Sequence, residues 1–409
     1  MKSIPLDELA CLATGRPTGL FAKDVEERRY ELADSIAGCR ILVIGGAGSI
    51  GSATIREIIR FGPSAIHVVD QNENGLTELV RDLRSQPTGL AIDEFRTFPI
   101  DFGSPIMARL IATATPYDCV LNFAALKHVR SEKDILSLLQ MFDTNIVKAA
   151  GLLRCFTACG FRGRYFAVST DKAANPVNLM GASKRLMEHV TLSGDFAGVQ
   201  FEALISARFA NVAFSDGSLL HGFLQRLQKE QPLAVPGGAR RFFVSTREAG
   251  QLCMIAAFCA ADRAILIPRL DPVDDLHDLR EIAEKVLVAH GFTPRLYESE
   301  REARTCVVTD RESGHYPLLL TPLDTSGEKV SEEFVGKNEM ACEIGLSHLL
   351  SVQYEPLSPG AVGRFVQRLE RVIRDTSTPV EKAMLVEEVT AILPEFRHVE
   401  TGRTLDGRM

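Results

Sequence analysis

The sequence predicts an α/β protein built on a doubly wound parallel sheet, and two observations support that prediction. Short apolar runs alternate with helical segments from about residue 39 to residue 210, a pattern typical of parallel strands joined by right-handed crossover helices. The runs are continuous, as in RILVIGG and AIHVVD, rather than alternating with polar residues. Strands buried on both faces of a sheet show that continuity.

Each element in this region has its own signal. The first helix is expected from about Ser49 and ends before Gly62 and Pro63, because glycine and proline interrupt helices. The segment GLTELVRDLRS places apolar residues at helical spacing and predicts a second helix. Further strands are expected at residues 94–101, 117–125, 162–170 and 201–209, with helices at 105–114 and 134–159 and another that carries Met180 and Lys184.

Beyond Asn211 the alternation loosens and turn-forming residues increase, which indicates a smaller lobe over the carboxyl ends of the strands. The last fifty residues contain amphipathic helices. The sequence therefore predicts a Rossmann-type sheet domain with a smaller C-terminal substrate lobe and a helical tail. The expected boundaries are a helical N-terminal extension at 1–38, a dinucleotide-binding domain at 39–210 plus 245–270, a substrate lobe at 211–244 plus 271–360, and a helical segment at 361–409.

Composition and charge exclude several classes of protein. The 409 residues carry a formal charge of −7, whereas duplex-binding proteins usually present a concentrated basic face. No apolar run approaches the ~18–20 residues that a membrane helix needs. The nine cysteines include no Cys-x-x-Cys pair and the nine histidines no His-x-x-x-His pair, so no metal site is expected. We predict a cytoplasmic protein with reduced thiols that binds neither nucleic acid nor membrane.

The stretch VIGGAGSIG joins the first predicted strand to the first helix. Gly45, Gly48 and Gly51 are three residues apart, which permits a tight turn, close approach of a pyrophosphate, and close packing of helix against strand. The backbone N–H groups at the helix start, including those of Ser49 and Ile50, can then hold the phosphates. A dinucleotide-binding turn is therefore predicted.

Asp70 ends the second predicted strand, at the spacing where a carboxylate can hydrogen-bond the ribose diol of the dinucleotide. The same charge would repel a 2′-phosphate, and QNENG, which follows, offers no arginine to bind one. The sequence thus favours NAD over NADP. Two interpretations of Asp101 stay open, a contact with the adenine edge and a turn-forming aspartate. The nicotinamide side of the cleft is expected to be lined by Asn122, Ala124 and Ala125.

The stretch STDKAANPVNLMGASKR concentrates groups that can handle protons. Thr170, Asp171 and Lys172 follow a predicted buried strand, and Lys184 lies on the next helix. One turn before Lys184, on the same helix face, is Met180. Its thioether has no proton to give, so we expect Met180 to pack against the ligands.

The motifs GGAGSIG, NFAALKHV, STDKAANPVNLMGASKR, RFANV and RRFFVS occur in that order. They resemble the extended short-chain dehydrogenases that dehydrate nucleotide-activated N-acetylglucosamine. LDTSGEKVSEEF and the ending HVETGRTLDGRM are similar to the soluble enzymes of legionaminic-acid pathways. The resemblance covers nearly the whole chain. It implies an NAD-dependent nucleoside-diphosphate-GlcNAc 4,6-dehydratase of bacterial surface-sugar synthesis, acting on a nucleotide sugar as a homo-oligomer.

The resemblance assigns the proton chemistry to the strand-end cluster. Asp171 would be the acid at C6 and Lys172 the base at C5, which requires a raised pKa for the first and a depressed pKa for the second. Thr170 would hydrogen-bond the C4 oxygen, and Lys184 would bind the nicotinamide ribose. Met180 stands where related dehydrogenases have a tyrosine that deprotonates the alcohol, so the C4 proton must pass to the cluster. Relatives with methionine there retain the configuration at C5, which favours retention.

Substrate contacts are expected from both lobes. Lys127 and His128 would touch the sugar or its phosphates, and Asn211 and Arg241 the nucleotide diphosphate. Asn145 is interpreted as a structural or proton-relay residue.

The chain departs from the broader family pattern at Arg130, Ala210 and Asp216. These differences leave the nucleotide base open, so UDP-GlcNAc and GDP-GlcNAc are both candidate substrates. A nucleotide-sugar 4-epimerase is an alternative, although it has no use for the Asp171 and Lys172 pair. A non-catalytic NAD-binding sensor is a second alternative, against which the intact cluster argues.

Overall fold

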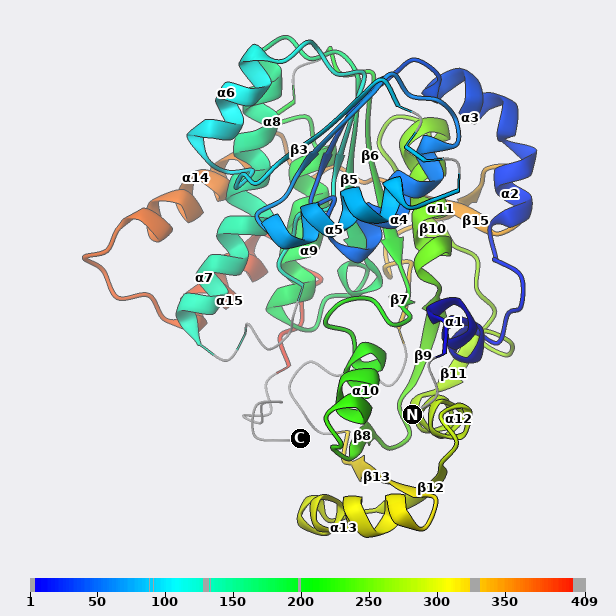
Figure 1. Cartoon of the computed structure of the whole chain (residues 1–409). Coiled ribbons are helices and arrows are strands. Elements are labelled where there is room, and N and C mark those ends of the chain that lie inside the picture. Colours follow the sequence, from blue (N-terminus) through cyan, green and yellow to red (C-terminus); the bar gives the residue numbers. More distant parts are fainter. Residues whose placement is uncertain are drawn as a thin grey trace.

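A nine-stranded sheet forms the centre of the molecule (Figure 1). The structure, a computed structural model, describes residues 4–87, 89–90, 92–127, 132, 134–197, 200–323 and 332–399. The strand order across the sheet is β14-β15-β10-β6-β5-β4-β1-β2-β3. These strands are β1 (Arg40–Ile44), β2 (Ala65–Val69), β3 (Glu94–Phe98), β4 (Cys119–Asn122), β5 (Arg164–Thr170), β6 (Ala203–Phe209), β10 (Ala264–Pro268), β14 (Ala341–Glu343) and β15 (Leu349–Gln353).

Seven neighbouring strands of this sheet pair in parallel, in the order β3-β2-β1-β4-β5-β6-β10. The chain builds outward from β1 in one direction and from β4 in the other, so the strand order reverses between them. This is the doubly wound arrangement that the sequence predicts, and the predicted fold class is confirmed. In such sheets the reversal opens a crevice at the carboxyl ends of the strands.

Helices cover both faces of the sheet, and each face has its own apolar core. Successive side chains of β1 alternate between them: Ile41 and Val43 pack into one core, Leu42 and Ile44 into the other. The first core contains helices α2 (Ala22–Glu27), α3 (Arg29–Ile36), α4 (Ser49–Ile59), α5 (Glu73–Arg84) and α11 (Thr246–Cys259). The second contains α6 (Pro105–Thr113), α7 (Ile135–Phe142), α8 (Lys148–Ala158), α9 (Leu179–Leu192), α14 (Ala361–Arg374) and α15 (Lys382–Ile392).

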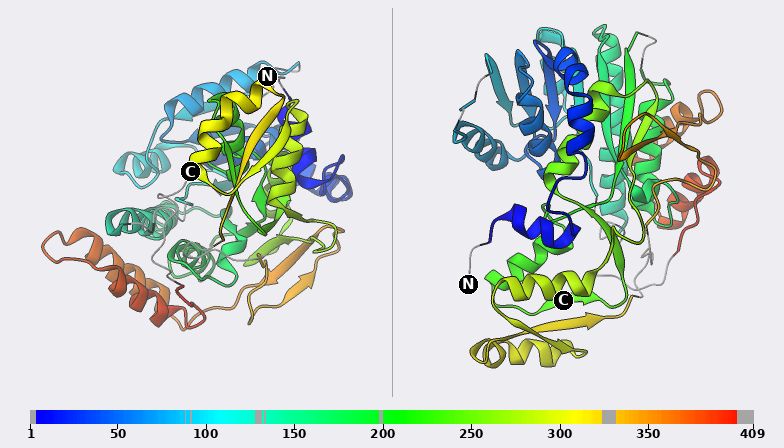
Figure 2. Two further views of the ribbon diagram at one scale, coloured as in Figure 1. Left: turned by 90° about the horizontal axis from the view of Figure 1, so that it is seen from below. Right: turned by 90° about the vertical axis from the view of Figure 1, so that its right-hand side faces the viewer.

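A smaller lobe lies below the sheet in the view of Figure 1 and again in the right-hand view of Figure 2. It holds two three-stranded sheets, β11-β9-β7 and β12-β13-β8. Its strands are β7 (Asn211–Val212), β8 (Leu233–Pro236), β9 (Arg240–Val244), β11 (Leu276–Asp278), β12 (Thr293–Tyr297) and β13 (His315–Thr321). Its helices are α10 (Leu219–Gln228), α12 (Leu279–Ala289) and α13 (Glu300–Glu312), and α1 (Leu6–Thr14) joins its apolar core.

Two neighbouring strands differ from the prediction. β14 and β15, which the sequence placed in the smaller lobe, extend the main sheet: β15 pairs antiparallel with β10, and β14 pairs antiparallel with β15. Their pairing buries Leu349 and Val352 and covers the edge of β10. The segment PLAVPGGARRFF forms strands β8 and β9 of the smaller lobe. Its apolar residues Leu233, Val235 and Phe243 fill the core of the lobe.

No helix within the described ranges is long and apolar enough to cross a membrane. Nor do His, Cys, Asp and Glu side chains in those ranges gather into a group of three that could hold a metal ion.

Candidate active site

A cavity of about 790 Å³ lies at the carboxyl ends of β1, β2, β4, β5 and β6. It opens where the strand order reverses, and its volume is within the usual range for ligand pockets. Most of the predicted site residues line it. They are Gly45, Gly48, Ser49, Ile50, Gly51, Asp70, Asp101, Ala124, Ala125, Lys127, Thr170, Asp171, Lys172, Met180, Lys184 and Asn211.

The glycine-rich turn between β1 and α4 forms one wall of the cavity. Gly45 has φ +74°, in the left-handed region that favours glycine. A Cβ on Gly51 would lie 2.6 Å from the carbonyl oxygen of Gly45, so only glycine permits this approach. No side chain caps the N-terminus of α4 at Gly48, and its first backbone N–H groups are left for a ligand. The turn fits the pyrophosphate of a dinucleotide.

Two carboxylates follow the neighbouring strands. Asp70 accepts hydrogen bonds from two backbone N–H groups, those of Ala47 at 3.1 Å and Asn72 at 2.9 Å, which fixes it beside the glycine-rich turn. Asp101 accepts one from the N–H of Gly103 at 2.9 Å and pairs with Lys148 at 2.6 Å. Asp101 thus forms a turn while also lining the cavity.

The strand-end cluster is brought together as the motif predicts. β5 ends at Thr170, and Asp171 and Lys172 begin a short 3-10 turn, η3 (Asp171–Ala173). The Thr170 hydroxyl donates to Oδ1 of Asp171 at 2.6 Å, and Nζ of Lys172 lies 3.1 Å from the same oxygen. Asp171 is only 1% exposed. One carboxylate oxygen therefore contacts both a hydroxyl and an ammonium group.

The predicted pKa shifts of this pair are wrong in sign. Burial of Asp171 acts to raise its pKa, but the charge of Lys172 and the hydrogen bond from Thr170 outweigh it, so the pKa lies below its usual range. Burial acts to lower the pKa of Lys172, but the charges of Asp171 and Glu332 raise it above its usual range. In the resting site the pair is an ion pair, with the aspartate ionised and the lysine protonated.

Met180 and Lys184 lie on α9, on the cavity side. Met180 is 2% exposed, and Nζ of Lys184 donates to the carbonyl oxygen of Val168 at 2.7 Å. Burial lowers the pKa of Lys184 to about 7, against the opposing charge of Glu188.

Asn145 lies in the π-helical turn η2 (Asp143–Val147) between α7 and α8. Its side chain binds both backbone groups of Leu126 at 2.8 Å and the Ser183 hydroxyl at 3.0 Å. These bonds hold the segment after β4 against α9. The structural interpretation of Asn145 therefore accounts for its hydrogen bonds.

Two predicted site residues do not line the cavity. Asn122 is buried beneath it, where its amide accepts from the N–H of Ala124 at 3.0 Å and donates to the Tyr165 hydroxyl at 3.1 Å. Asn122 thus shapes the turn after β4 instead of lining the cavity. Arg241 on β9 directs Nε toward Glu332, 3.4 Å from Oε1. His128 lies outside the described residues.

Glu332 is a site residue that sequence reasoning missed. Its Oε1 lies 3.0 Å from Nζ of Lys172, and its Oε2 accepts from the Asn211 amide at 2.6 Å. Burial, reinforced by the charge of Asp171, raises the pKa of Glu332 to about 7. Glu332 lies in the stretch LDTSGEKVSEEF, which carries part of the family resemblance. Neither periodicity nor spacing in that stretch indicates that this glutamate belongs to the site.

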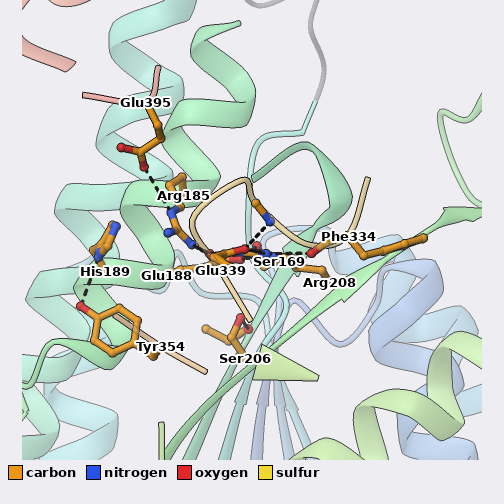
Figure 3. A network of polar contacts seen from close by, with 12 residues as sticks. Ser169, Arg185, Glu188, His189, Ser206, Arg208, Phe334, Glu339, Tyr354 and Glu395 are labelled. Carbon is orange, nitrogen blue, oxygen red and sulfur yellow. Dashed lines mark hydrogen bonds and ion pairs between the residues drawn. The ribbon is translucent and has the colours of Figure 1, made fainter. Parts of the chain in front are cut away.

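A buried ion-pair network next to the cluster was also missed (Figure 3). Arg208 on β6 is fully buried and pairs with Glu188 of α9 at 2.7 Å and with Glu339 at 2.6 Å. Arg185 adds a second guanidinium, 3.0 Å from Glu188. The Ser169 hydroxyl, next to Thr170, donates to Glu188 at 2.6 Å. The network ties β5, β6 and α9 to the segment that follows Glu332.

The fold and this arrangement are those of a dinucleotide-binding α/β protein with a doubly wound parallel sheet. Residues 41–353 match the family model described as polysaccharide biosynthesis protein, and the chain belongs to that family.

Relatives from three organisms are similar to the chain. It is 32% identical over 257 residues to an uncharacterised membrane protein of Methanocaldococcus jannaschii, covering 62% of this chain and 73% of that one. It is 27% identical over 332 residues to a probable polysaccharide biosynthesis protein, EpsC, of Bacillus subtilis, covering 79% of this chain but only 49% of that one. It is 26% identical over 261 residues to an inverting UDP-N-acetylglucosamine 4,6-dehydratase of Campylobacter jejuni, covering 63% and 71%.

Solved structures support the fold. Pen from Bacillus thuringiensis has a TM-score of 0.63 at 19% identity, over 82% of this chain and 98% of that one. A double mutant of DesIV, a dTDP-glucose 4,6-dehydratase from Streptomyces venezuelae with NAD bound, has a TM-score of 0.53 at 17% identity, over 88% and 98%.

Proposed function

We propose that the chain is an NAD-dependent 4,6-dehydratase that converts UDP-GlcNAc or GDP-GlcNAc to the corresponding 4-keto-6-deoxy sugar, with retention at C5. The observation that carries the proposal is the contact of Asp171 with both Thr170 and Lys172 at the end of β5. A 4-epimerase needs no acid and base for loss of water. Met180 in the position of a tyrosine also favours a reaction whose protons pass through this cluster.

Bound NAD supplies the chemistry of hydride removal at C4 and of hydride return at C6. The proton of the C4 hydroxyl is then left to the protein. The Thr170 hydroxyl accepts it and passes its own proton to Asp171, 2.6 Å away, which is ionised at rest. The low pKa of Asp171, contrary to the prediction from sequence, suits it to this first step.

Asp171 then carries the proton that the C6 oxygen needs when it leaves as water. Lys172 takes the proton from C5 and returns it to C5 after C6 has been reduced. The C4 hydroxyl proton thus leaves in the water molecule, and Asp171 is ionised again for the next turnover. We propose that Lys184 holds the nicotinamide ribose and that the product enters bacterial surface-sugar synthesis of the legionaminic-acid type.

Incubation with NAD and each nucleotide sugar, followed by mass spectrometry, tests the proposal. Loss of one water from UDP-GlcNAc or GDP-GlcNAc is expected, and the substrate that reacts identifies the base. An isomer of unchanged mass would identify a 4-epimerase instead, and no conversion of either substrate would favour a sensor. The configuration at C5 of the product decides between retention and the inversion named for the Campylobacter relative.

The chain is expected to bind NAD at least about tenfold more tightly than NADP, because a 2′-phosphate would meet the carboxylate of Asp70. Asp70 lines the cavity and is fixed by two backbone N–H groups, so it cannot easily turn away. Calorimetric titration of the ligand-free chain with both dinucleotides measures the ratio. Equal or tighter binding of NADP would contradict this placement of Asp70.

Met180→Leu is expected to keep turnover within about tenfold of the wild type, which corresponds to ~1.4 kcal/mol in the barrier. Leucine keeps most of the apolar bulk that Met180 presents to the cavity and removes only the sulfur. The rate is measured with NAD-loaded, correctly folded protein. A loss of ~10³-fold would show that the thioether does more than pack.

A further inference from the structure

We infer that Glu332 accepts the proton of Lys172 and so frees the amine to act as base at C5. This inference rests on the proposed dehydration, and it assigns a role to a residue that the sequence analysis did not single out. Glu332 lies behind Lys172 and is not among the cavity-lining residues. Because it acts through Lys172 and not on the substrate, it is a positioning residue.

The argument begins with a count of protons. Lys172 is protonated at rest, since the charges of Asp171 and Glu332 outweigh burial and raise its pKa. An ammonium group cannot take the proton from C5. Asp171 can accept one proton, and in the proposed reaction that is the C4 hydroxyl proton. The proton of Lys172 therefore needs a second acceptor.

Glu332 has the geometry of that acceptor. Its Oε1 lies 3.0 Å from Nζ of Lys172, a direct hydrogen bond along which a proton can move. Its Oε2 is held by the Asn211 amide at 2.6 Å, so the carboxyl group is fixed in place. The ionisable groups that face it are Asp171 and Lys172 from η3 and Arg241 from β9. The Glu332 side chain is 5% exposed, so solvent has little access to the proton.

The proton balance closes over one turnover. Lys172 gives its proton to Glu332, takes the C5 proton as C6 loses water, and returns that proton to C5. Glu332 then gives the stored proton back to Lys172. No external acid or base is consumed, because the single proton released at C4 leaves in the water through Asp171.

The resulting pH dependence can be worked out from the state of Glu332. Burial, with the charge of Asp171, raises its pKa to about 7, so it is a carboxylate above neutral pH and an acid below it. Only the carboxylate can accept the proton of Lys172. The kcat of the wild type is therefore expected to fall as the pH drops through about 7.

Glu332→Gln keeps the size of the side chain and one accepting oxygen, but it can keep only one of the hydrogen bonds from Lys172 and Asn211, and it removes the proton acceptor. We expect kcat at pH 7 to fall by about tenfold or more, with KM for the nucleotide sugar within about twofold. The pH at which kcat falls should move up by at least one unit, because Lys172 must then lose its proton without help. Substrate deuterated at C5 should slow this variant more than it slows the wild type.

Two further variants complete the test. Glu332→Asp keeps a carboxyl group, and its kcat should still fall near neutral pH even if its rate is lower. Glu333→Gln, an exposed neighbour, should behave as the wild type in rate and pH profile. A Glu332→Gln variant with the kcat, pH profile and isotope effect of the wild type would overturn the inference. So would a Glu332→Asp variant whose pH profile shifts as that of Glu332→Gln does.

Failure of the proposed function gives a different result. If the wild type releases no water from either nucleotide sugar, the dehydration is rejected and the role of Glu332 with it. If the wild type is active and Glu332→Gln is unchanged, only the role of Glu332 is rejected.

Discussion

Asp171→Asn is expected to lower kcat by at least ~10²-fold while NAD binding stays near that of the wild type. Asparagine keeps a side-chain oxygen that can accept from Thr170 at 2.6 Å and from Lys172 at 3.1 Å, so the geometry of the cluster is preserved. Its amide can neither receive the C4 proton nor deliver one to the departing C6 oxygen. The variant therefore loses two proton transfers in each turnover.

Because both transfers fail together, the loss should lie toward the upper end of the ~10²–10⁴-fold range found for a single general acid or base. Turnover is measured by mass spectrometry of the product, and bound NAD by its absorbance after denaturation. Melting with and without NAD checks that the variant folds. Turnover within tenfold of the wild type would show that the C4 proton takes another path.

Most of the fold could be predicted because the signals were local. The continuous apolar runs predicted the buried strands. The glycines of VIGGAGSIG predicted the start of α4, which begins at Ser49 as expected. The edge strands β14 and β15 could not be placed from sequence. They are short and half exposed. β15 is identified by its pairing with β10, a contact across about eighty residues that no local pattern encodes, and β14 by its pairing with β15.

Some residues of the site could likewise be predicted from local sequence, and others only from the tertiary structure. Those that follow strand ends, such as Asp70 and Thr170, could be predicted because the carboxyl ends of parallel strands meet at one edge. Glu332 could not, because its segment reaches Lys172 only through tertiary structure. The pKa directions of Asp171 and Lys172 were missed for the same reason. The sequence showed both groups, but their mutual distance and the charge of Glu332 decide which form is stable.

Arg208→Met is expected to lower the free energy of unfolding by about 3–5 kcal/mol at neutral pH, the usual effect of removing one partner from a buried ion pair. Methionine fills much of the same space but leaves Glu188 and Glu339 without one of the two guanidinium groups that now contact both. Arg185 still contacts Glu188 at 3.0 Å, but it cannot replace the bidentate contact that Arg208 makes with Glu188, at 2.8 and 2.7 Å. The loss should also disturb the site, because the network anchors the segment that follows Glu332 (Figure 3).

The pH dependence of this loss has a defined sign. In the wild type burial acts to raise the pKa of Glu188, but the charge of Arg208 holds it at about 2. That pairing stabilises the fold above the ordinary pKa of a glutamate, about 4.3, and is lost as the pH falls toward 2. In Arg208→Met burial is less well opposed, so the pKa of Glu188 rises and the carboxylate becomes costly at neutral pH. The loss of unfolding free energy relative to the wild type should therefore be larger at pH 7 than at pH 5. Urea unfolding of both proteins at each pH measures it.

Arg154→Met, which removes an exposed pair with Glu370, is the matched control and should lower the free energy of unfolding by no more than about 1 kcal/mol. A similar small cost for Arg208→Met, or a deficit that grows toward acid pH, would contradict a charged, buried network that holds the site together.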